Sequence, residues 1–502
     1  MIADPPRPRT TATVAFVVGA ASLGTEIGAA RLLAPFFGDS TFVWANTIAT
    51  ILVGLAAGYW FGGRLADRRP RLSVMCALIA AAAVLLALVP FVARPLLGAA
   101  SSALDEVSAG AFVGSLVGVL GLVFLPVCLL GAVAPFTIRL SVAEVADAGR
   151  VSGRIYAVST IGSLVGTFLA ALLLIPAIGT RKTFLVFALS LALVAMVGLP
   201  RRLILIPLAV GALFVVPVGA VKPPGAGERL LYEEETPYQY ARVVERPDGE
   251  RLLELDEGQA VHSVYRPGSF LTGGYWDDSL VLPFATRGGP PRRIAILGDA
   301  AGSMARGYGH FFPRTRIDAV EIDAAVTAIG RRFFNLAAPH LRTITADARV
   351  FVRNPGPDYQ AIILDAYRQP YIPFHLTTRE FFEELRERLA PGGVVLVNVG
   401  HPEGSDELEK VLAATMESSL PFVSSEPFDR TNTWLLGAMR RPRPARILAA
   451  RWLLAPPLDP IAARAARRMR PPPTGGEVYT DDHAPIEWLI DRSLLGYAEG
   501  DR

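Results

Sequence analysis

Several residues in the second half of the chain have side chains suited to binding a nucleoside or accepting a proton, and each follows a short apolar segment. They are Gly298 and Gly302, then Glu321, Asp347 and Asp365. Glycine lets the backbone approach a ligand closely, and an acid after the next segment can accept both ribose hydroxyls. A carboxylate can also take a proton from a nucleophile. The spacing therefore indicates nucleoside chemistry.

The segments that carry these residues are typical of parallel strands. Four short, mainly apolar runs at even spacing lead to Gly298, Glu321, Asp347 and Asp365, and residues 376–390 and 394–397 continue the order as a helix and a strand. In an open parallel sheet, ligands lie beyond the carboxyl ends of the strands, so these residues should converge on one crevice. The motif Gly298-x-x-x-Gly302 is equally typical of a plain turn, but Glu321 about 20 residues later favours the nucleoside interpretation.

The first half of the chain has a different composition. The protein has 502 residues and a mean hydropathy of +0.37, and the apolar excess lies before about residue 221. Stretches close to the roughly 20 residues that cross a bilayer recur there. We therefore predict three parts: an all-α polytopic membrane domain over 1–221, a small β-hairpin domain and linker over 222–290, and a Rossmann-like, class I methyltransferase-like doubly wound sheet over 291–502.

Seven apolar stretches are candidates for crossing the bilayer. They lie near 12–35, 43–63, 72–94, 109–138, 155–177, 183–199 and 203–221. Short arginine-rich loops, densest at 64–71, favour a cytoplasmic amino terminus. Seven crossings would then place the second half outside, so we expect one stretch not to cross. The candidates are the last one, which contains Pro207 and Pro217, and 109–138, which Pro126 could break.

Composition also argues against other classes of protein. The formal net charge is +3, and no basic stripe interleaved with aromatic residues indicates nucleic-acid binding. Both cysteines, Cys76 and Cys128, lie in predicted membrane stretches, and no histidine pair has metal-ligand spacing. We predict no metal, no prosthetic group and no nucleic-acid partner, and we leave a homo-oligomer open.

The second half resembles the spermidine synthase family of polyamine aminopropyltransferases, from about residue 231 to 397. The whole chain resembles the bacterial membrane-fused branch of that family, through Gly24-Thr-Glu26, Arg31-Leu-Leu-Ala-Pro35, Trp44 and the run from Gly58 to Arg64. The resemblance implies transfer of an aminopropyl group from decarboxylated S-adenosylmethionine to an amine such as putrescine. It also implies a multi-pass protein of the bacterial inner membrane, with lipid as a partner and the second half in the cytoplasm.

The resemblance assigns roles residue by residue. Gly298 to Arg306 corresponds to the glycine-rich loop, Glu321 to the ribose-binding acid and Asp347 to the adenine-contacting acid. Asp365 lies at the position of the catalytic aspartate. The amine-lining positions are Tyr275 and the hairpin residue Gln259. An amine attacks only when deprotonated, so a carboxylate such as Asp365 must accept its proton and hold it in line.

The chain departs from the family at two acids. The family's loop acid is Ala301 here, and the second acid of its Asp-x-x-Asp-Pro stretch is Arg368. We expect Asp299, in the same loop, to restore the lost charge beside the nucleoside. We also expect Asp481 and Asp482, in the run from Val478 to Glu487, to fold back toward the amine, although an acidic cap of a final helix explains that run equally well.

Two other functions remain open. The lost acids and Arg368 favour a methyltransferase that uses S-adenosylmethionine, whose carboxylate they would repel less. The same losses also fit a transporter or sensor whose degenerate nucleoside domain regulates the membrane half.

Overall fold

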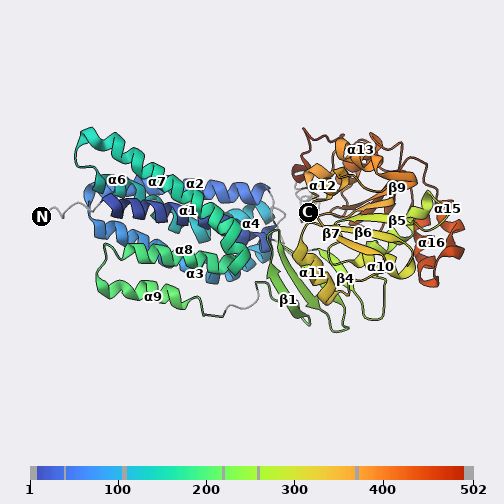
Figure 1. Cartoon of the computed structure of the whole chain (residues 1–502), viewed down its shortest axis with the longest axis horizontal. Coiled ribbons are helices and arrows are strands. Elements are labelled where there is room, and N and C mark those ends of the chain that lie inside the picture. The colour runs from blue at the N-terminus through green and yellow to red at the C-terminus, as the bar shows by residue number, and fades with distance from the viewer. Residues whose placement is uncertain are drawn as a thin grey trace. The chain divides into compact units, whose positions relative to one another are not determined.

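The computed structural model describes residues 8–38, 41–104, 110–217, 221–256, 260–367 and 372–490. The chain divides into two compact units, Met1–Pro223 and Pro224–Arg502. The first is entirely helical over its described residues, whereas the second contains both sheets. This division separates the apolar half of the sequence from the half that carries the predicted chemistry (Figure 1).

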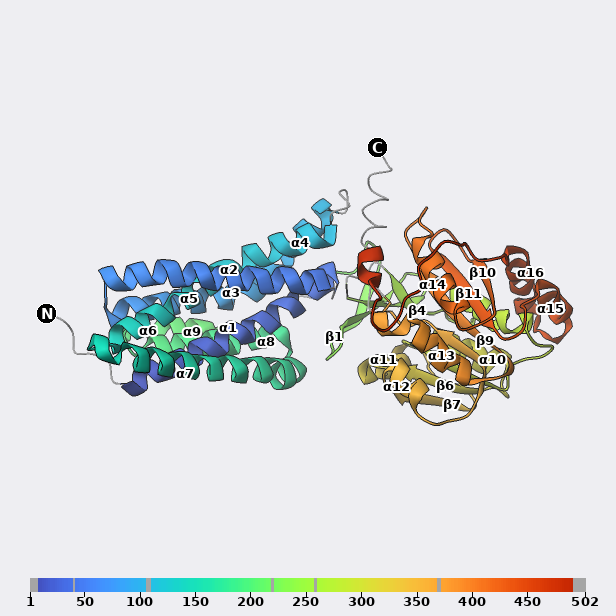
Figure 2. The same ribbon diagram turned by 90° about the horizontal axis from the view of Figure 1, so that it is seen from above.

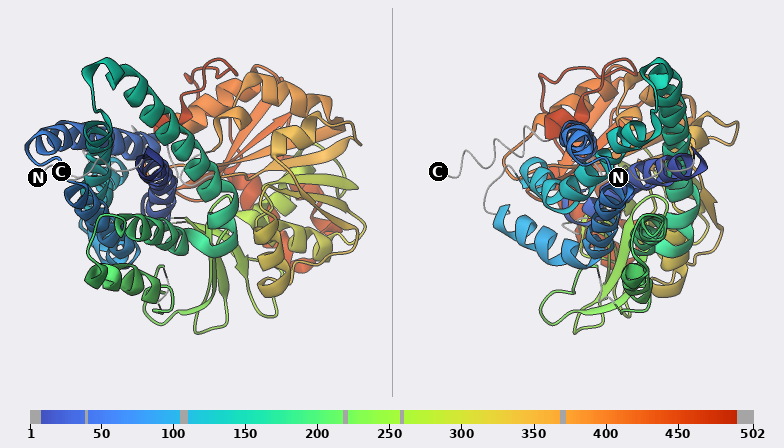
Figure 3. Two further views of the ribbon diagram at one scale, coloured as in Figure 1. Left: turned by 60° about the vertical axis from the view of Figure 1, so that its left-hand side comes forward. Right: turned by 90° about the vertical axis from the view of Figure 1, so that its left-hand side faces the viewer.

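The first unit is a helical bundle (Figures 2 and 3). Its helices are α1 (Pro8–Phe37), α2 (Thr41–Arg68), α3 (Leu72–Leu104), α4 (Gly110–Val119), α5 (Leu125–Gly131), α6 (Val133–Ser141), α7 (Ala148–Phe168), α8 (Ile175–Ala195) and α9 (Leu205–Ala212). Five segments are long and apolar enough to cross a membrane: Arg9–Phe37, Thr41–Arg68, Leu72–Ala99, Phe112–Ser141 and Val145–Ala195. Their length and composition suggest membrane association.

The structure bears on four of the seven predicted stretches. The stretch at 109–138 is not broken at Pro126, because Phe112–Ser141 is one apolar segment with a π-helical turn at Leu120–Phe124. The stretches at 155–177 and 183–199 both lie in Val145–Ala195, where Gly179 (φ 78°) interrupts the helix. In the last stretch, α9 has only eight residues, well short of the roughly 20 that cross a bilayer.

Helices α1 and α7 pack closely because glycines line their contact. A Cβ added at Gly162 would lie 2.2 Å from the carbonyl oxygen of Phe16, and one at Gly166 would lie 2.0 Å from that of Ala20. Small residues let helix backbones approach in lipid, where apolar side chains gain little from leaving an equally apolar solvent. These glycines are explained by packing.

A four-stranded antiparallel sheet begins the second unit. Its strands, in spatial order, are β1 (Arg229–Glu235), β2 (Tyr240–Glu245), β3 (Arg251–Leu255) and β4 (Val261–Tyr265). The turn after β2 contains Gly249 at φ 80°, a left-handed conformation that suits glycine. Two 3₁₀ helices, Tyr275–Leu280 and Leu282–Ala285, then lead into the larger sheet.

The larger sheet has seven strands. They are β5 (Arg293–Leu297), β6 (Arg316–Glu321), β7 (Leu341–Thr345), β8 (Tyr359–Leu364), β9 (Leu389–Gly400), β10 (Phe422–Pro427) and β11 (Asn432–Ala438). Their order is β10-β11-β9-β8-β5-β6-β7. Strands β5 to β9 are parallel to one another, and β11 is antiparallel to both of its neighbours, β9 and β10. This is the predicted Rossmann-like, class I methyltransferase-like arrangement, and its strand order reverses between β5 and β8.

Helices cover both faces of this sheet (Figure 1). They are α10 (Ser303–Phe311), α11 (Ala324–Phe333), α12 (Ala348–Arg353), α13 (Arg379–Glu387), α14 (Glu407–Glu417), α15 (Pro444–Ala449) and α16 (Asp459–Arg468). Strand β5 shows why: Ile294 and Ile296 join one buried cluster, and Ala295 and Leu297 join another. Side chains alternate along a strand, so an uninterrupted apolar run requires cover on both sides.

Candidate active site

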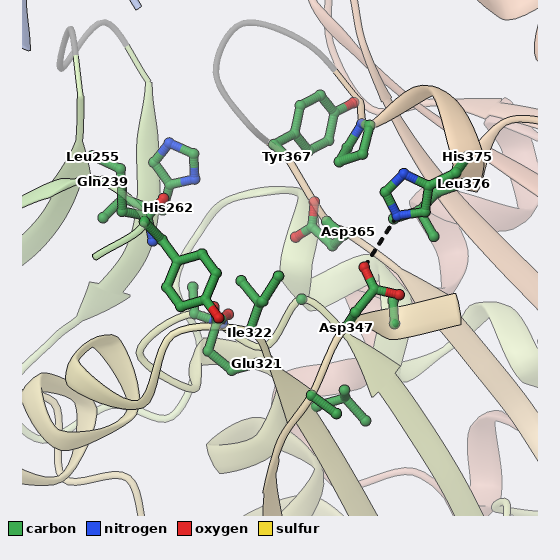
Figure 4. Close-up of a pocket in the computed structure, with 18 of the residues that line it drawn as sticks. Gln239, Leu255, His262, Glu321, Ile322, Asp347, Asp365, Tyr367, His375 and Leu376 are labelled. Atoms are coloured by element: carbon green, nitrogen blue, oxygen red, sulfur yellow. Dashed lines mark hydrogen bonds and ion pairs between the residues drawn. The ribbon is translucent and has the colours of Figure 1, made fainter. Parts of the chain in front are cut away.

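Two cavities meet at the carboxyl ends of β5 and β8, where the strand order reverses. The first has a volume of about 320 Å³ and the second about 430 Å³. Both include His262, Gly298, Ala300, Asp365 and Tyr367 in their walls. Ligands of doubly wound sheets bind at such a reversal point, so this pair of cavities is the candidate site (Figure 4).

The loop after β5 forms the floor shared by both cavities. Gly298 (φ 89°) and Gly302 (φ 92°) adopt left-handed conformations that favour glycine. A Cβ at Gly298 would lie 2.5 Å from the carbonyl oxygen of Asp365, and one at Gly302 would lie 2.2 Å from Leu336 Cδ1. Both the backbone conformation and the lack of space therefore require glycine at these two positions. At Gly298 the loop packs against Asp365, the candidate catalytic residue.

Glu321 ends β6 and lies in the wall of the first cavity. Its Oε2 accepts a hydrogen bond from the backbone N–H of Ala300 (3.0 Å), and its Oε1 accepts one from that of Asp323 (3.1 Å). Burial raises the pKa of Glu321 to about 7, although these N–H groups lower it. The backbone thus fixes a carboxyl group at the end of the second strand, as the nucleoside interpretation requires.

Asp347 lies in the same cavity and is held by two kinds of partner. Its Oδ1 accepts from the N–H groups of Arg349 and Val350 at the start of α12, and its Oδ2 lies 3.0 Å from His375 Nε2 (Figure 4). Although burial raises the pKa of Asp347, these bonds outweigh it and leave the pKa below its usual value. His375 also lines this cavity. No sequence pattern indicated this contact beyond the presence of a histidine after β8.

Asp365 follows β8 and belongs to both cavities. Asn398 Nδ2 donates to its Oδ1 (2.7 Å), and the Tyr275 hydroxyl donates to its Oδ2 (3.1 Å). Burial raises the pKa of Asp365 to about 6, and the bonds from Asn398 and Tyr275 oppose that rise. A carboxylate with a pKa near neutrality is suited to accept a proton from an amine. Asn398 is a binding partner that was missed from the sequence, although it interrupts the apolar run of β9.

Asp299 is buried in the wall of the second cavity, with 4% of its surface exposed. The backbone N–H of Ala305 bonds its carboxyl group, whereas Oδ1 has no hydrogen-bond partner in the described part of the chain. Burial, together with the nearby charges of Glu321 and Asp365, holds its pKa well above the usual value. A cation beside Oδ1 would favour the ionised form. Ala301, at the position of the family's loop acid, is fully buried.

Tyr275 is anchored through its backbone as well as its hydroxyl. Trp434 Nε1 donates to the carbonyl oxygen of Tyr275 (3.0 Å), and the ring of Tyr275 stacks on Trp276 with 4.3 Å between centroids. Burial and the charge of Asp365 hold the pKa of the tyrosine well above its usual value. Its hydroxyl therefore remains a donor and keeps the carboxylate of Asp365 in place.

Among the described residues of these walls, the side chains of the types that ordinarily carry a full charge in water at neutral pH are all acids. They are Asp299, Glu321, Asp347 and Asp365, and the described residues of both walls include neither lysine nor arginine. The described part of the chain also shows no group of three or more His, Cys, Asp or Glu residues that could hold a metal. Such a site favours a cationic ligand.

Two predicted amine-binding residues, Asp481 and Asp482, do not line these cavities. Arg349 binds the carboxylate of Asp481 through two nitrogens (2.6 and 2.7 Å), and Thr378 donates to the same carboxylate. Asp482 is exposed at the surface. Neither residue lines these two cavities, which departs from our expectation, because the charge of Asp481 is already compensated by Arg349. Gln259, like Arg368, lies outside the described residues.

Curated proteins with similar sequences carry names from one area of chemistry. A probable polyamine aminopropyl transferase of Bifidobacterium longum is 32% identical over 190 residues, covering 38% of this chain and 42% of the relative. A polyamine aminopropyltransferase of Vibrio vulnificus is 39% identical over 112 residues, covering 22% and 38%. The chain is similar in sequence to polyamine aminopropyltransferases. It spans about two fifths of the length of these two relatives.

The similarity extends to a methyltransferase. Putrescine N-methyltransferase 2 of Nicotiana tabacum is 29% identical over 176 residues, covering 34% of this chain and 47% of that protein. No protein-family profile matches the chain. The resemblance to the polyamine aminopropyltransferases that was drawn from the sequence is confirmed by the named relatives, and the sheet order confirms the predicted fold.

Proposed function

We propose that the protein is a membrane-anchored aminopropyltransferase. The donor is decarboxylated S-adenosylmethionine, and the acceptor is a small amine such as putrescine. The observation that carries this proposal is the meeting of two cavities at Asp365, with acids as the charged residues of their described walls. The donor bears a sulfonium and an ammonium, and the acceptor is an amine, so every charged group entering the site is positive.

The first cavity suits the adenosine part of the donor. Glu321, fixed by the N–H groups of Ala300 and Asp323, would accept from the ribose hydroxyls, and Asp347 with His375 lies where the base would bind. The glycine loop at Gly298 allows the sugar to approach the backbone. The donor's aminopropyl group would then reach the second cavity, where Asp299 Oδ1 is unpartnered.

In the second cavity, Asp365 would take the proton that an arriving ammonium must lose, pass it to solvent, and then orient the free amine as a carboxylate. The amine nitrogen attacks the carbon next to sulfur, the carbon–sulfur bond breaks, and its electrons remain on sulfur as a neutral thioether. The positive charge thus moves from sulfur to nitrogen. Carboxylates at Asp365 and Asp299 stabilise that charge as it develops, because they are fixed in place before the reaction.

Product analysis of the purified full chain tests this proposal. The protein is incubated in detergent with decarboxylated S-adenosylmethionine and a panel of amines, and the products are identified by mass spectrometry. We expect an aminopropylated amine, and we expect D365N to lower turnover by roughly 10²- to 10⁴-fold. D365N should still be stabilised against heat by the nucleoside. Unchanged turnover in D365N would contradict the role of Asp365.

A methyltransferase that uses S-adenosylmethionine is the second candidate, and two observations favour it. Ala301 stands at the position of the family's loop acid, and one relative is named putrescine N-methyltransferase 2. S-adenosylmethionine carries a carboxylate, which would meet Asp299 and Asp365 without a cation among the described wall residues. Thermal stabilisation by each nucleoside at equal concentration ranks the two donors directly, because it grows with concentration over the dissociation constant.

The side of the membrane also belongs to this proposal. The donor nucleoside is a cytosolic metabolite, so we place the α/β unit in the cytoplasm and the helical unit in the bacterial inner membrane. Protease accessibility of the α/β unit in inverted compared with right-side-out vesicles tests this assignment.

A further inference from the structure

The two cavities meet at a junction of five residues, and the reaction must occur there because the donor carbon and the amine nitrogen come together at that point. Three of the five have polar side chains: His262, Asp365 and Tyr367. The Tyr367 hydroxyl is already saturated, since it donates to the carbonyl oxygen of Asn398 (2.9 Å) and accepts from the N–H of Gly400 (2.6 Å). His262 and Asp365 therefore remain to bind a ligand.

One ring nitrogen of His262 lacks a hydrogen-bond partner among the described residues. This atom, Nε2, is buried, and the residue lines both cavities. A buried polar atom without a partner costs stability, roughly 1–3 kcal/mol in proteins, unless a ligand or water supplies one. In Figure 4, His262 projects from its strand on the opposite side of the pocket from His375, with Asp365 between them.

The backbone around His262 is fixed against the glycine loop. Ser263 Oγ accepts a hydrogen bond from the N–H of Ala301 (3.0 Å), and the N–H of Val264 donates to Ser303 Oγ (2.8 Å). Both contacts join β4 to the loop that also bears Gly298. The imidazole is thus held on the same rigid frame as Asp365, which is a condition for directing a substrate.

Burial lowers the pKa of His262 to about 4, so the ring is uncharged near neutral pH. An uncharged imidazole does not repel a cationic substrate. With its proton on Nδ1, the ring presents a lone pair at Nε2. At the junction, His262 is therefore an acceptor and not a source of protons.

We infer that His262 and Asp365 together hold the two N–H groups of a primary amine acceptor, and so direct its lone pair at the donor carbon. This inference rests on the proposed function and adds a residue to it. A neutral primary amine has two N–H groups and one lone pair. When fixed acceptors bind both N–H groups, the orientation of the lone pair on nitrogen is fixed as well.

The same arrangement stabilises the reaction as charge develops. Nitrogen gains a positive charge as the new carbon–nitrogen bond forms and the carbon–sulfur bond breaks, and both N–H groups become stronger donors. The product is a secondary ammonium that keeps these two hydrogens, so the contacts to His262 and Asp365 persist throughout the step. A secondary amine acceptor has a single N–H group and can satisfy only one of the two acceptors.

The inference predicts a preference for primary over secondary amines that depends on His262. Putrescine and its derivative with one methyl group on each nitrogen are compared as acceptors. For H262L, we expect kcat/KM with putrescine to fall roughly 10- to 100-fold, the value of one hydrogen bond to a charged group. With the dimethylated amine we expect less than a threefold change. H262Q, which keeps an acceptor oxygen, should restore most of the activity with putrescine.

Two results would overturn the inference: an equal loss with both amines in H262L, or full activity with putrescine. Heat stabilisation by 5′-methylthioadenosine reports the nucleoside cavity and should be unaltered in both variants. If the wild type transfers no aminopropyl group, the proposed function fails, and His262 is then assessed by binding. Added putrescine should raise the melting temperature of the nucleoside-bound wild type and H262Q more than that of H262L, and equal shifts would reject the inference.

Discussion

Glu426 and Trp434 lie directly opposite each other on strands β10 and β11, and both contact the 3₁₀ helix that carries Tyr275. Trp434 donates to the carbonyl oxygen of Tyr275, and Glu426 faces Asp278, three residues further along. The nearest cation, Arg468 on α16, is 3.5 Å from Asp278 and 3.6 Å from Glu426. A buried pair of acids thus supports the segment that positions the hydroxyl beside Asp365.

This pair of acids should make the free energy of unfolding fall as pH rises. Burial raises the pKa of Glu426 to about 8 and that of Asp278 to about 6. Both folded-state values lie above the usual values of 4.5 and 3.8, so their stabilising contribution is present below these and is lost as pH rises toward 8. Arg464, Arg468 and Asp277 also act on the pair. We expect this contribution to the melting temperature of the wild type to be lost between about pH 4 and 8, by roughly 2–4 °C per kcal/mol lost.

E426Q should melt with a weaker pH dependence, measured by fluorescence of the detergent-purified chain. E409Q is the matched control, because Glu409 is also buried but is bound by the Ser425 hydroxyl. A pH dependence in E426Q as steep as in the wild type would refute the role of the pair.

Asn398 should set the acid limb of the pH–rate profile. Its hydrogen bond opposes the raised pKa of Asp365, so removing the donor should raise that pKa further above about 6. A hydrogen bond to a charged group is worth about 1.5–3 kcal/mol, or roughly one to two pH units. In N398L the acid limb of kcat/KM should move to higher pH, and the rate at pH 7 should fall. N432L removes the hydrogen bond that Asn432 donates to Asn398 and should shift the acid limb less. Coincident pH–rate profiles for N398L and the wild type would contradict this prediction.

Gly298 should tolerate no side chain. Alanine there would adopt φ 89° and place its Cβ 2.5 Å from the carbonyl oxygen of Asp365. Gly404 is a matched control, since it has φ 83° with nothing within 4 Å. We expect G404A to cost about 1–2 kcal/mol, the cost of the left-handed conformation alone. G298A should cost more and abolish heat stabilisation by the nucleoside; equal melting temperatures for the two variants would show that the collision is relieved by the backbone.

Asp481 should contribute to stability and not to amine binding. Arg349 lowers the pKa of Asp481, so its contribution is present above the usual value of 3.8 and is lost as pH falls. The side chain of Asp481 is 42% exposed, which limits its contribution to about 1 kcal/mol. D481N should lower the melting temperature at neutral pH and leave the KM for the amine unchanged. D482N, at an exposed position, should change neither, whereas a raised KM in D481N would restore the amine-binding role that the sequence suggested.

The parts of the site that could be predicted share one property: they lie at strand ends. Gly298, Glu321 and Asp365 were found because parallel strands bring their carboxyl ends to one edge, and a repeating pattern of apolar runs marks those ends. The fold followed from the same alternation of strands and helices. The helical unit was predicted from stretches of apolar residues; Gly179 interrupts the helix between two predicted stretches, and the short helix α9 lies in a stretch that was a candidate for not crossing.

The residues that were missed or misplaced depend on contacts between distant segments. Asp481 meets Arg349, 132 positions away, and no local pattern indicates that pairing. His262 belongs to an alternating strand of the smaller sheet, and only the packing of that sheet on the glycine loop brings it to the junction. Asn398 is the exception, since a single polar residue within the apolar run of β9 is a recognisable signal.

The shared wall of the two cavities has a kinetic consequence. Because Asp365 borders both, the adenosyl compound and the amine can be bound at once, and no side chain needs to carry the transferred group between them. Under the proposed function, turnover proceeds through a ternary complex, so initial-rate plots for one substrate at several levels of the other should intersect instead of running parallel.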